Sequence, residues 1–228
     1  MNGVRLNIQV SQFEELQKTL DQRIRAHAMP SSVEDPVDVL RRWLFLSREF
    51  PRFLGGILSR ISEPRAQCLV AKNITGECGN GVHDEMHSLL LAQVVISAIG
   101  ADRAQMDTGA LAVLIERKLA EISRMTAGEA IGFLIGLEAP AYDILDLLQS
   151  CLAKAGMDQA SIERAPYIAI HQAVEKTHQD DSLAMAEVIR SLGCESREIV
   201  RGGDSAVDFW SAWWSTAYVA TAPEAKRA

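Results

Sequence analysis

The stretch AGEAIGFLIGLEAPAYDIL, residues 127–145, decides the fold class of this chain. Apolar residues fill it without the alternation of a strand, and glycines recur at positions 128, 132 and 136. This spacing predicts a helix with one smooth stripe, against which a neighbouring helix can approach closely. Pro140 leaves the carbonyl of Gly136 without its backbone donor, so we expect a kink in a helix that runs from Thr126 to about Leu152.

Glu138 is the one carboxylate inside the apolar part of this stretch. A charged carboxylate in such surroundings is costly unless it is paired or binds a cation. Two simpler arrangements remain open from the sequence: Glu138 lies on a narrow exposed face of the helix, or it pairs with an arginine.

Helical periodicity continues on both sides of that stretch, whereas the period-two alternation of strands is scarce. The pattern predicts an all-α fold of seven or eight helices. The expected helices cover residues 13–24, 37–50 with a continuation past Pro51 over 53–61, a segment opened by Pro64, 82–99, 109–124, 126–152, 167–192 and 205–219. We expect a single domain over residues 1–228, with 1–30 as its N-terminal helix and 221–228 as a frayed tail.

Composition excludes several classes of function. The chain has 228 residues and 30 acidic against 23 basic side chains, and its net charge of −7 gives no general attraction to nucleic acid or anionic lipid. The longest nearly continuous apolar run, residues 89–101, is too short to cross a bilayer. The N-terminus lacks the layout of a secretory signal, and the four cysteines are scattered without a CxxC. We therefore expect a cytoplasmic protein that binds neither nucleic acid nor membrane.

The segment YIAIHQAVEKTHQDD, which begins at Tyr167, carries the strongest local pattern for chemistry. His171, Glu175 and His178 stand at i, i+4 and i+7 and therefore project from one face of a helix. Tyr167 and Val174 share that face, which predicts that it points into the protein. Two imidazoles and a carboxylate form a ligand set suited to iron, manganese or zinc. A solvated polar face, or buried histidines paired with Glu175, would give the same pattern.

A second segment, NITGECGNGVHDEMHSLLLAQ, begins at Asn73 and supplies Glu77, His83 and His87 around a glycine-rich break. His83 and His87 are four residues apart, as in zinc hydrolases. HDEMH nevertheless places Asp84 where those enzymes have the glutamate that serves as general base, so the segment gives little support to a zinc hydrolase. One of the two histidines is expected to be exposed, because both cannot easily serve one site alongside Glu77.

These motifs, taken in chain order, resemble the metal-binding series of the haem-oxygenase-like diiron oxidases and oxygenases. The series is Glu77-x9-His87, Glu138 and His171-x3-Glu175-x2-His178. The resemblance covers about residues 37–218 and implies a haem-oxygenase-like bundle of about seven helices, in which these six residues bind two Fe(II) ions per chain. The family usually has aspartate at the position of Glu175, so this carboxylate could reach the metals differently. His87 fits the spacing of the family, and His83 is the fallback ligand.

By the same resemblance, the irons would activate dioxygen as co-substrate through a peroxo species. We expect the oxidation of a small carboxylate-bearing metabolite, with an amino acid or its derivative as the first choice. The resemblance also leaves room for an external electron donor and for a homodimer. Two alternatives from other classes remain: a cofactorless or thiaminase-like enzyme of the same fold, and a non-enzymatic helical interaction module.

Aromatic residues supply candidates for the substrate pocket. Tyr142 follows Glu138 by one turn, and Tyr167 precedes His171 by one turn, so both could flank the site. Core packing with one hydrogen bond would explain either tyrosine as well. The three tryptophans of DFWSAWWSTAY, near the C-terminus, lie at i, i+3 and i+4, which is typical of core; an exposed part would be a candidate dimer interface.

Overall fold

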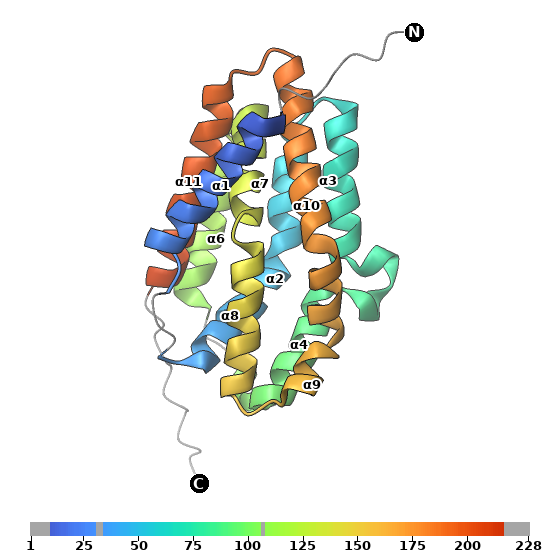
Figure 1. Cartoon of the computed structure of the whole chain (residues 1–228), viewed down its shortest axis with the longest axis vertical. Coiled ribbons are helices and arrows are strands. Elements are labelled where there is room, and N and C mark those ends of the chain that lie inside the picture. The colour runs from blue at the N-terminus through green and yellow to red at the C-terminus, as the bar shows by residue number, and fades with distance from the viewer. Residues whose placement is uncertain (1–9, 31–33, 106–107, 217–228) are drawn as a thin grey trace.

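Helices make up most of the protein in a computed structural model that describes residues 10–30, 34–105 and 108–216 (Figure 1). None of these residues is in a β-strand, so the all-α prediction is confirmed. The elements are α1 (Val10–His27), α2 (Pro36–Leu58), α3 (Pro64–Glu77), the 3-10 helices η1 (Gly79–Gly81) and η2 (His83–Glu85), α4 (His87–Ile99), α5 (Ala101–Ala104), α6 (Gly109–Ile122), α7 (Ala127–Glu138), α8 (Ala141–Lys154), α9 (Gln159–Glu163), α10 (Pro166–Ser191) and α11 (Ser196–Ser215). The predicted N-terminal helix corresponds to α1, and the predicted tail at 221–228 lies outside the described residues.

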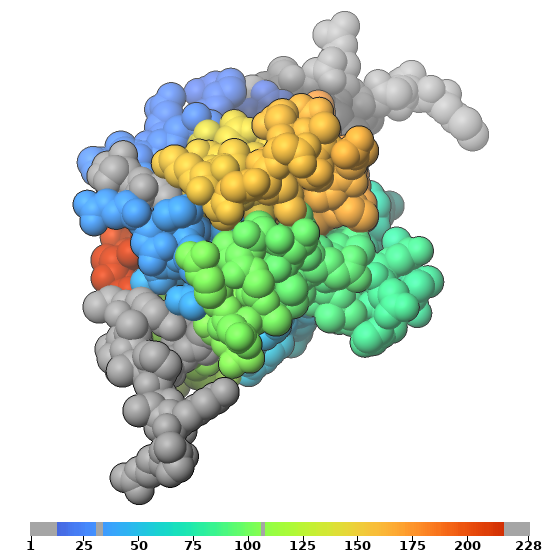
Figure 2. All heavy atoms as spheres, turned by 90° about the horizontal axis from the view of Figure 1, so that it is seen from below, coloured from blue at the N-terminus to red at the C-terminus, as the bar shows by residue number. Residues whose placement is uncertain are grey.

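The long helices run in nearly one direction, with α7 and α8 end to end at the centre of Figure 1. On one side lie α6 and α11, and on the other α3 and α10. Seen from below, α4 lies beside α8 and α9 at the lower end of the bundle (Figure 2). The buried apolar residues form two clusters, and α10 contributes Ile168 to one and Leu183 to the other. The polar residues of α10 at positions 171–178 lie between them in the chain.

The glycine stripe of α7 packs against α11, as the sequence predicts. A Cβ atom at Gly132 would clash with the backbone oxygen of Ile199, and one at Gly202 would clash with the backbone of α7. The predicted start of the last helix at Ser205 is wrong, because α11 begins at Ser196. Its paired glycines allow close packing in the middle of the helix and do not end it.

The kink predicted at Pro140 is a full break. α7 ends at Glu138, and α8 begins three residues later. The indole Nε1 of Trp210 donates a hydrogen bond of 3.2 Å to the carbonyl of Gly136, the acceptor that the proline leaves without a backbone donor. Gln179 donates to the carbonyl of Glu138 at 3.2 Å. The break therefore leaves Glu138 at the C-terminal end of α7, with its backbone bound to α10.

At Pro51 the helix continues over residues 53–58, in agreement with the sequence, which places a continuation of the helix over residues 53–61 beyond this proline. A proline inside a helix costs about 3 kcal/mol. Leu46, Phe53 and Ile57 lie on one face of α2 and are all buried in the core. Burying such side chains contributes roughly 1.5–3 kcal/mol each, which offsets the local cost.

The aromatic part of α11 belongs to the core. Trp210 and Trp213 are 2% and 0% exposed, and only Trp214 of the three tryptophans is half-buried. Most of the aromatic surface considered for a dimer interface is thus buried, Trp214 alone of the three tryptophans is partly exposed, and homodimerisation stays a prediction. None of the described helices combines the length and the apolar composition needed to cross a membrane.

Candidate metal centre

Six side chains from four helices gather in two groups, and within each group the potential ligand atoms lie within 4.8 Å of one another. The first group is Glu77 of α3, His87 of α4 and His171 of α10. The second is Glu138 of α7 with Glu175 and His178 of α10. All six residues singled out from the sequence are therefore brought together, with His87 and not His83 among them.

α10 contributes to both groups because its polar residues are spaced i, i+4 and i+7. The Nδ1 of His171 lies 2.8 Å from the carbonyl oxygen of Tyr167, one turn earlier. A carbonyl can only accept, so Nδ1 carries the proton and Nε2 presents its lone pair. The ring of Tyr167 packs on that imidazole with centroids 4.0 Å apart, and the ring of His87 meets it edge-on at 4.7 Å. These contacts fix the orientation of His171.

Three carboxylates share this interior, and their charges oppose one another. Burial, together with the charges of Glu175 and Glu77, raises the pKa of Glu138 well above its usual value. Burial and the charge of Glu77 raise the pKa of Glu175 to about 7. Burial also opposes ionisation of Glu77, but its contact with His87 and the nearby imidazoles bring its pKa below the usual value. Without a cation, Glu138 and Glu175 therefore retain protons near neutral pH.

The imidazoles are in the form that binds metals. Burial lowers the pKa of His171 to about 4 and also lowers the pKa of His178, so both rings are neutral at pH 7. Neutral imidazole has the lone pair that a metal requires. The Nδ1 of His87 approaches Glu77 Oε1 to 3.2 Å, but at an angle that does not make a hydrogen bond.

Buried polar atoms without partners test whether metal ions fit this interior. Among the described residues, His87 Nδ1 and Glu175 Oε2 are buried and make no hydrogen bond. Leaving such an atom unsatisfied costs about 1–3 kcal/mol. Divalent cations would satisfy both atoms and neutralise the carboxylates, and three carboxylates with three imidazoles form a donor set suited to iron or manganese. The residues present therefore fit metal ions in two adjoining positions.

Two amides position Glu138. Asn73, one turn before Glu77 on α3, donates through Nδ2 to Glu138 Oε1 at 3.3 Å. Gln179, next to His178, binds the carbonyl of the same glutamate. With only 4% of its surface exposed, Glu138 lies on no exposed face, and in the described structure its side chain accepts from an amide and not from an arginine. The sequence analysis included Asn73 in the second segment but assigned it no role. It missed Gln179, and the position of this residue next to His178 was the only indication in the sequence.

A space of about 60 Å³, the inner cavity, adjoins both groups. Apolar side chains such as Leu46 and Trp210 form most of its wall. Tyr167 lines it, accepts a hydrogen bond of 2.9 Å from the indole Nε1 of Trp43, and has a pKa raised well above its usual value by burial and by the charge of Glu77. The Oγ of Ser47 is buried in the same wall. The sequence missed Trp43 and Ser47, although their i, i+4 spacing places them on one face of α2.

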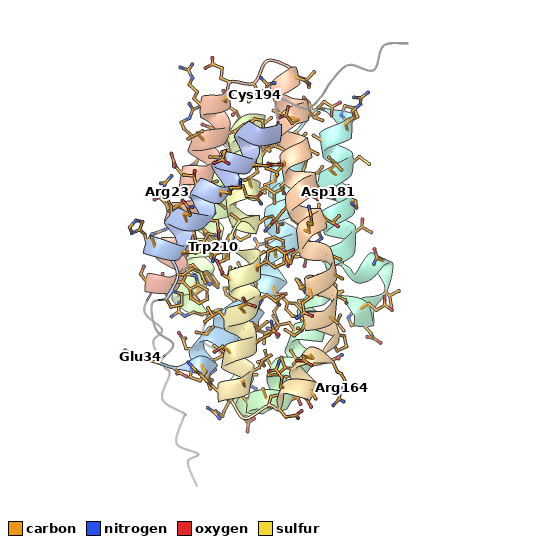
Figure 3. The ribbon with its side chains drawn as sticks, in the orientation of Figure 1. Arg23, Glu34, Arg164, Asp181, Cys194 and Trp210 are labelled. Carbon is orange, nitrogen blue, oxygen red and sulfur yellow. The ribbon has the colours of Figure 1, made fainter. Side chains whose placement is uncertain are left out.

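A larger space of about 590 Å³, the outer cleft, is lined by residues of α3, η1, η2, α10 and the start of α4, including Glu85, and reaches His87 and His178. An ion pair joins α3 to α10 at this cleft, with Lys72 Nζ 2.7 Å from Asp181 Oδ2. Figure 3 labels Asp181 on the side of α10 that is turned towards α3. The candidate metal centre thus adjoins a small apolar space and a large polar one.

Comparison with known proteins supports iron as the metal of this family. The family described as iron-containing redox enzymes matches residues 37–211. The chain belongs to this family. Two crystal structures of a CADD-like protein of unknown function from Nostoc punctiforme resemble this iron-containing redox enzyme with TM-scores of 0.72 and 0.67. Both are 18% identical to it and cover 90% of the chain, which spans 96% and 93% of theirs. This likeness confirms the haem-oxygenase-like helical fold, and no curated protein matches the sequence.

Two of the candidates from the sequence lie away from the centre of this redox enzyme. His83, the fallback ligand, is in η2 with its side chain 80% exposed and contacts Asp84. Tyr142 is 43% exposed and is not among the residues that line the inner cavity. Its predicted position one turn after Glu138 assumed a continuous helix, and the break at Pro140 removes that relation. Tyr167 does line the cavity.

Proposed function

We propose that this chain is an oxygen-dependent non-haem diiron oxidase or oxygenase. In this proposal Glu77, His87, Glu138, His171, Glu175 and His178 bind two Fe(II) ions per chain. The observation that carries it is the pairing of two adjoining groups of buried donors whose carboxylates lack a cationic side chain in the lining of the inner cavity. Membership of a family of iron-containing redox enzymes supports iron over manganese or zinc.

Bound iron would supply electrons and open coordination positions to dioxygen, the co-substrate. The chain's own residues would do the rest. Tyr167 fixes the tautomer of His171 through its carbonyl, and Asn73 orients the carboxylate of Glu138. The apolar wall of the inner cavity excludes water, which protects reactive species formed at the centre from side reactions.

The substrate in this proposal is a small carboxylate-bearing metabolite, with amino acids and their derivatives first. The supporting observation is Lys72, a cation that lines the cleft reaching His87 and His178. A carboxylate needs such a partner when it leaves water. An external electron donor, a homodimer and a cytoplasmic location stay predictions.

An anaerobic titration with Fe(II), followed by stopped-flow mixing with oxygenated buffer, tests the proposal. We expect about two irons per chain and a transient visible absorption after mixing. Glu138→Ala and His171→Ala should each lose iron and the transient, whereas His83→Ala, at an exposed histidine, should keep both. Circular dichroism of each variant shows whether the helices remain.

A wild-type chain that binds no iron above background would contradict the proposal. The same cavity would then be examined for organic ligands, beginning with substrates of the cofactorless and thiaminase-like enzymes. Alanine variants that change neither iron binding nor any small-molecule chemistry would instead favour a non-enzymatic helical module.

A further inference from the structure

We propose that the substrate binds in the outer cleft and not in the inner cavity, and that it is an α-amino acid with an apolar side chain. The carboxylate of the amino acid would pair with Lys72, and its ammonium group with Asp181. The oxidation of that substrate rests on the function proposed above, whereas its binding depends on the cleft alone. The argument has three parts: the size of each space, the charges that line it, and the order of side chains along α10.

Size separates the two spaces. A buried water needs roughly 10–15 Å³ of such volume, so the inner cavity, at about 60 Å³, has room for only about five water-sized groups. An amino acid with an apolar side chain is larger, whereas dioxygen is diatomic, apolar and suited to an apolar wall. The outer cleft, at about 590 Å³, falls within the range of about 300–1,000 Å³ that is usual for ligand pockets.

Charge separates them as well. Among the described residues, Lys72 is the one lysine or arginine that lines either space. In the metal-free protein, a carboxylate in the inner cavity would face the three glutamates without a cationic side chain, which is costly. With two Fe(II) ions bound, these glutamates would coordinate the metals and would leave no free carboxylate to pair with an ammonium group. In the outer cleft, Lys72 and Asp181 form a pair with one group of each sign, as an α-amino acid has, and Glu85 adds a second carboxylate to the lining.

The ion pair between those two residues is easily exchanged. Their side chains are 58% and 18% exposed, and exposed pairs contribute only about 0–1 kcal/mol. An incoming amino acid would replace this one pair with two, one to each of its own charges. Opening the pair between Lys72 and Asp181 therefore costs little free energy, and the ligand would form one ion pair with each of these residues.

The order of side chains on α10 sets the direction of the ligand. Asp181, His178, Val174 and Ile170 all line the cleft and follow one another at spacings of three or four residues, along one face of the helix. With a rise of about 1.5 Å per residue, His178 lies about 4.5 Å along the axis from Asp181, and Ile170 about 12 Å further on. An amino acid whose ammonium group is bound at Asp181 would thus pass His178 and extend its side chain towards Val174, about 10.5 Å along the axis from Asp181. Ile170, about 16.5 Å from Asp181, lies beyond the reach of leucine.

Isothermal titration calorimetry of the anaerobic Fe(II)-loaded protein and of the metal-free protein tests this inference. The probes are L-leucine, 4-methylpentanoate, which lacks the ammonium group, and 3-methylbutylamine, which lacks the carboxylate. We expect leucine to bind and each analogue to bind at least tenfold more weakly. Lys72→Gln and Asp181→Asn should each weaken leucine at least tenfold. The control variants Lys176→Gln and Asp180→Asn remove an exposed pair on the same helix outside the cleft and should leave leucine binding unchanged.

A third variant tests the apolar end of the cleft. Val174→Trp should weaken leucine more than it weakens L-alanine, whose side chain is too short to reach that position. The inference is overturned if leucine, L-methionine and L-phenylalanine all fail to bind the wild type at 10 mM. That concentration is about 10,000 times a dissociation constant of about 1 μM. It is overturned equally if Lys72→Gln and Asp181→Asn bind leucine like the wild type. If the wild type binds leucine but no iron, the diiron function is refuted and the outer cleft remains an amino-acid site.

Discussion

Replacing Glu138 with glutamine should stabilise the metal-free protein and weaken the metal-loaded one. The amide has nearly the shape of the carboxyl group, and its oxygen can still accept the hydrogen bond from Asn73. It cannot ionise, and an amide is a poorer ligand for a divalent cation than a carboxylate. The same substitution therefore acts with opposite sign in the two states.

The size of the effect on the metal-free state follows from the burial of Glu138. The unfolded chain ionises this group with a pKa of about 4.5, whereas the folded chain keeps the proton to a much higher pH. Each pH unit of that difference corresponds to about 1.4 kcal/mol, so the wild type is progressively destabilised relative to the glutamine variant as the pH rises above 4.5. Burying the amide of glutamine costs free energy as well, and we expect the metal-free variant to gain about 2 kcal/mol in its free energy of unfolding. For a chain of this length that is roughly 4–8 °C in melting temperature.

Bound metal should reverse the order of the melting temperatures, so that the wild type melts above Glu138→Gln. At a free Fe(II) concentration about 100 times the dissociation constant, binding stabilises the native state by about 2.7 kcal/mol, or roughly 5–11 °C. We expect Glu138→Gln to lose at least half of that rise. Anaerobic differential scanning calorimetry with a chelator and with excess Fe(II) measures both states. Glu163→Gln, at an exposed glutamate of α9, is the matched control and should follow the wild type. A metal-free Glu138→Gln protein that melts below the wild type, or an equal rise with Fe(II) in both, would refute the reasoning.

Three further predictions concern stability. Gly132→Ala should lower the free energy of unfolding by about 1–3 kcal/mol in a urea titration, because its Cβ meets the backbone of α11, whereas Gly55→Ala, with open space around it, should be neutral or slightly stabilising. Arg42→Met should lower the free energy of unfolding by about 3 kcal/mol, because the buried guanidinium binds the carbonyl of Trp213 and so joins α2 to the end of α11. An unchanged urea midpoint would contradict this prediction. Burial raises the pKa of Glu175 from 4.5 to about 7, so its contribution to the stability of the metal-free protein is present below pH 4.5 and is lost as the pH rises through 7. Burial lowers the pKa of His171 to about 4, which opposes this trend below pH 6.5, so melting temperatures should fall with rising pH from about 6.5 to 8. A flat profile over that range would contradict this assignment.

Local sequence predicted those parts of the structure that one helix determines by itself. The i, i+4, i+7 spacing on α10 placed three donors on one buried face, and the glycine stripe of α7 predicted a close neighbour. Pro140 was correctly expected to disturb the helix, but whether it kinks or ends depends on tertiary donors such as Trp210 and Gln179, which lie far away in the chain. The Gly-Gly pair of α11 has the same ambiguity, because glycines end helices as readily as they allow close packing.

The division of the donors into two groups could not be predicted from the sequence. It depends on which helices are neighbours, and α10 contributes to both groups because α3 and α4 meet one part of its length and α7 another. Tyr142 failed as a candidate for the same kind of reason, since its relation to Glu138 crosses a helix break. The outer cleft had no local signal either: Lys72 and Asp181 are 109 residues apart, and only the packing of α3 on α10 brings them together.

The position of Glu138 explains why this interior favours a cation. The carboxylate is buried, it lies near two others, and it ends α7, where the helix dipole places partial negative charge. All three contributions oppose its ionisation, and one cation bound between the groups would relieve all three. The same cation would join α7 to α10, which the hydrogen bond from Gln179 to the carbonyl of Glu138 already connects at the end of α7. Local destabilisation of this kind is tolerated where a ligand restores the lost free energy. Metal binding would therefore stabilise the region around Glu138, where burial and like charges destabilise the metal-free protein.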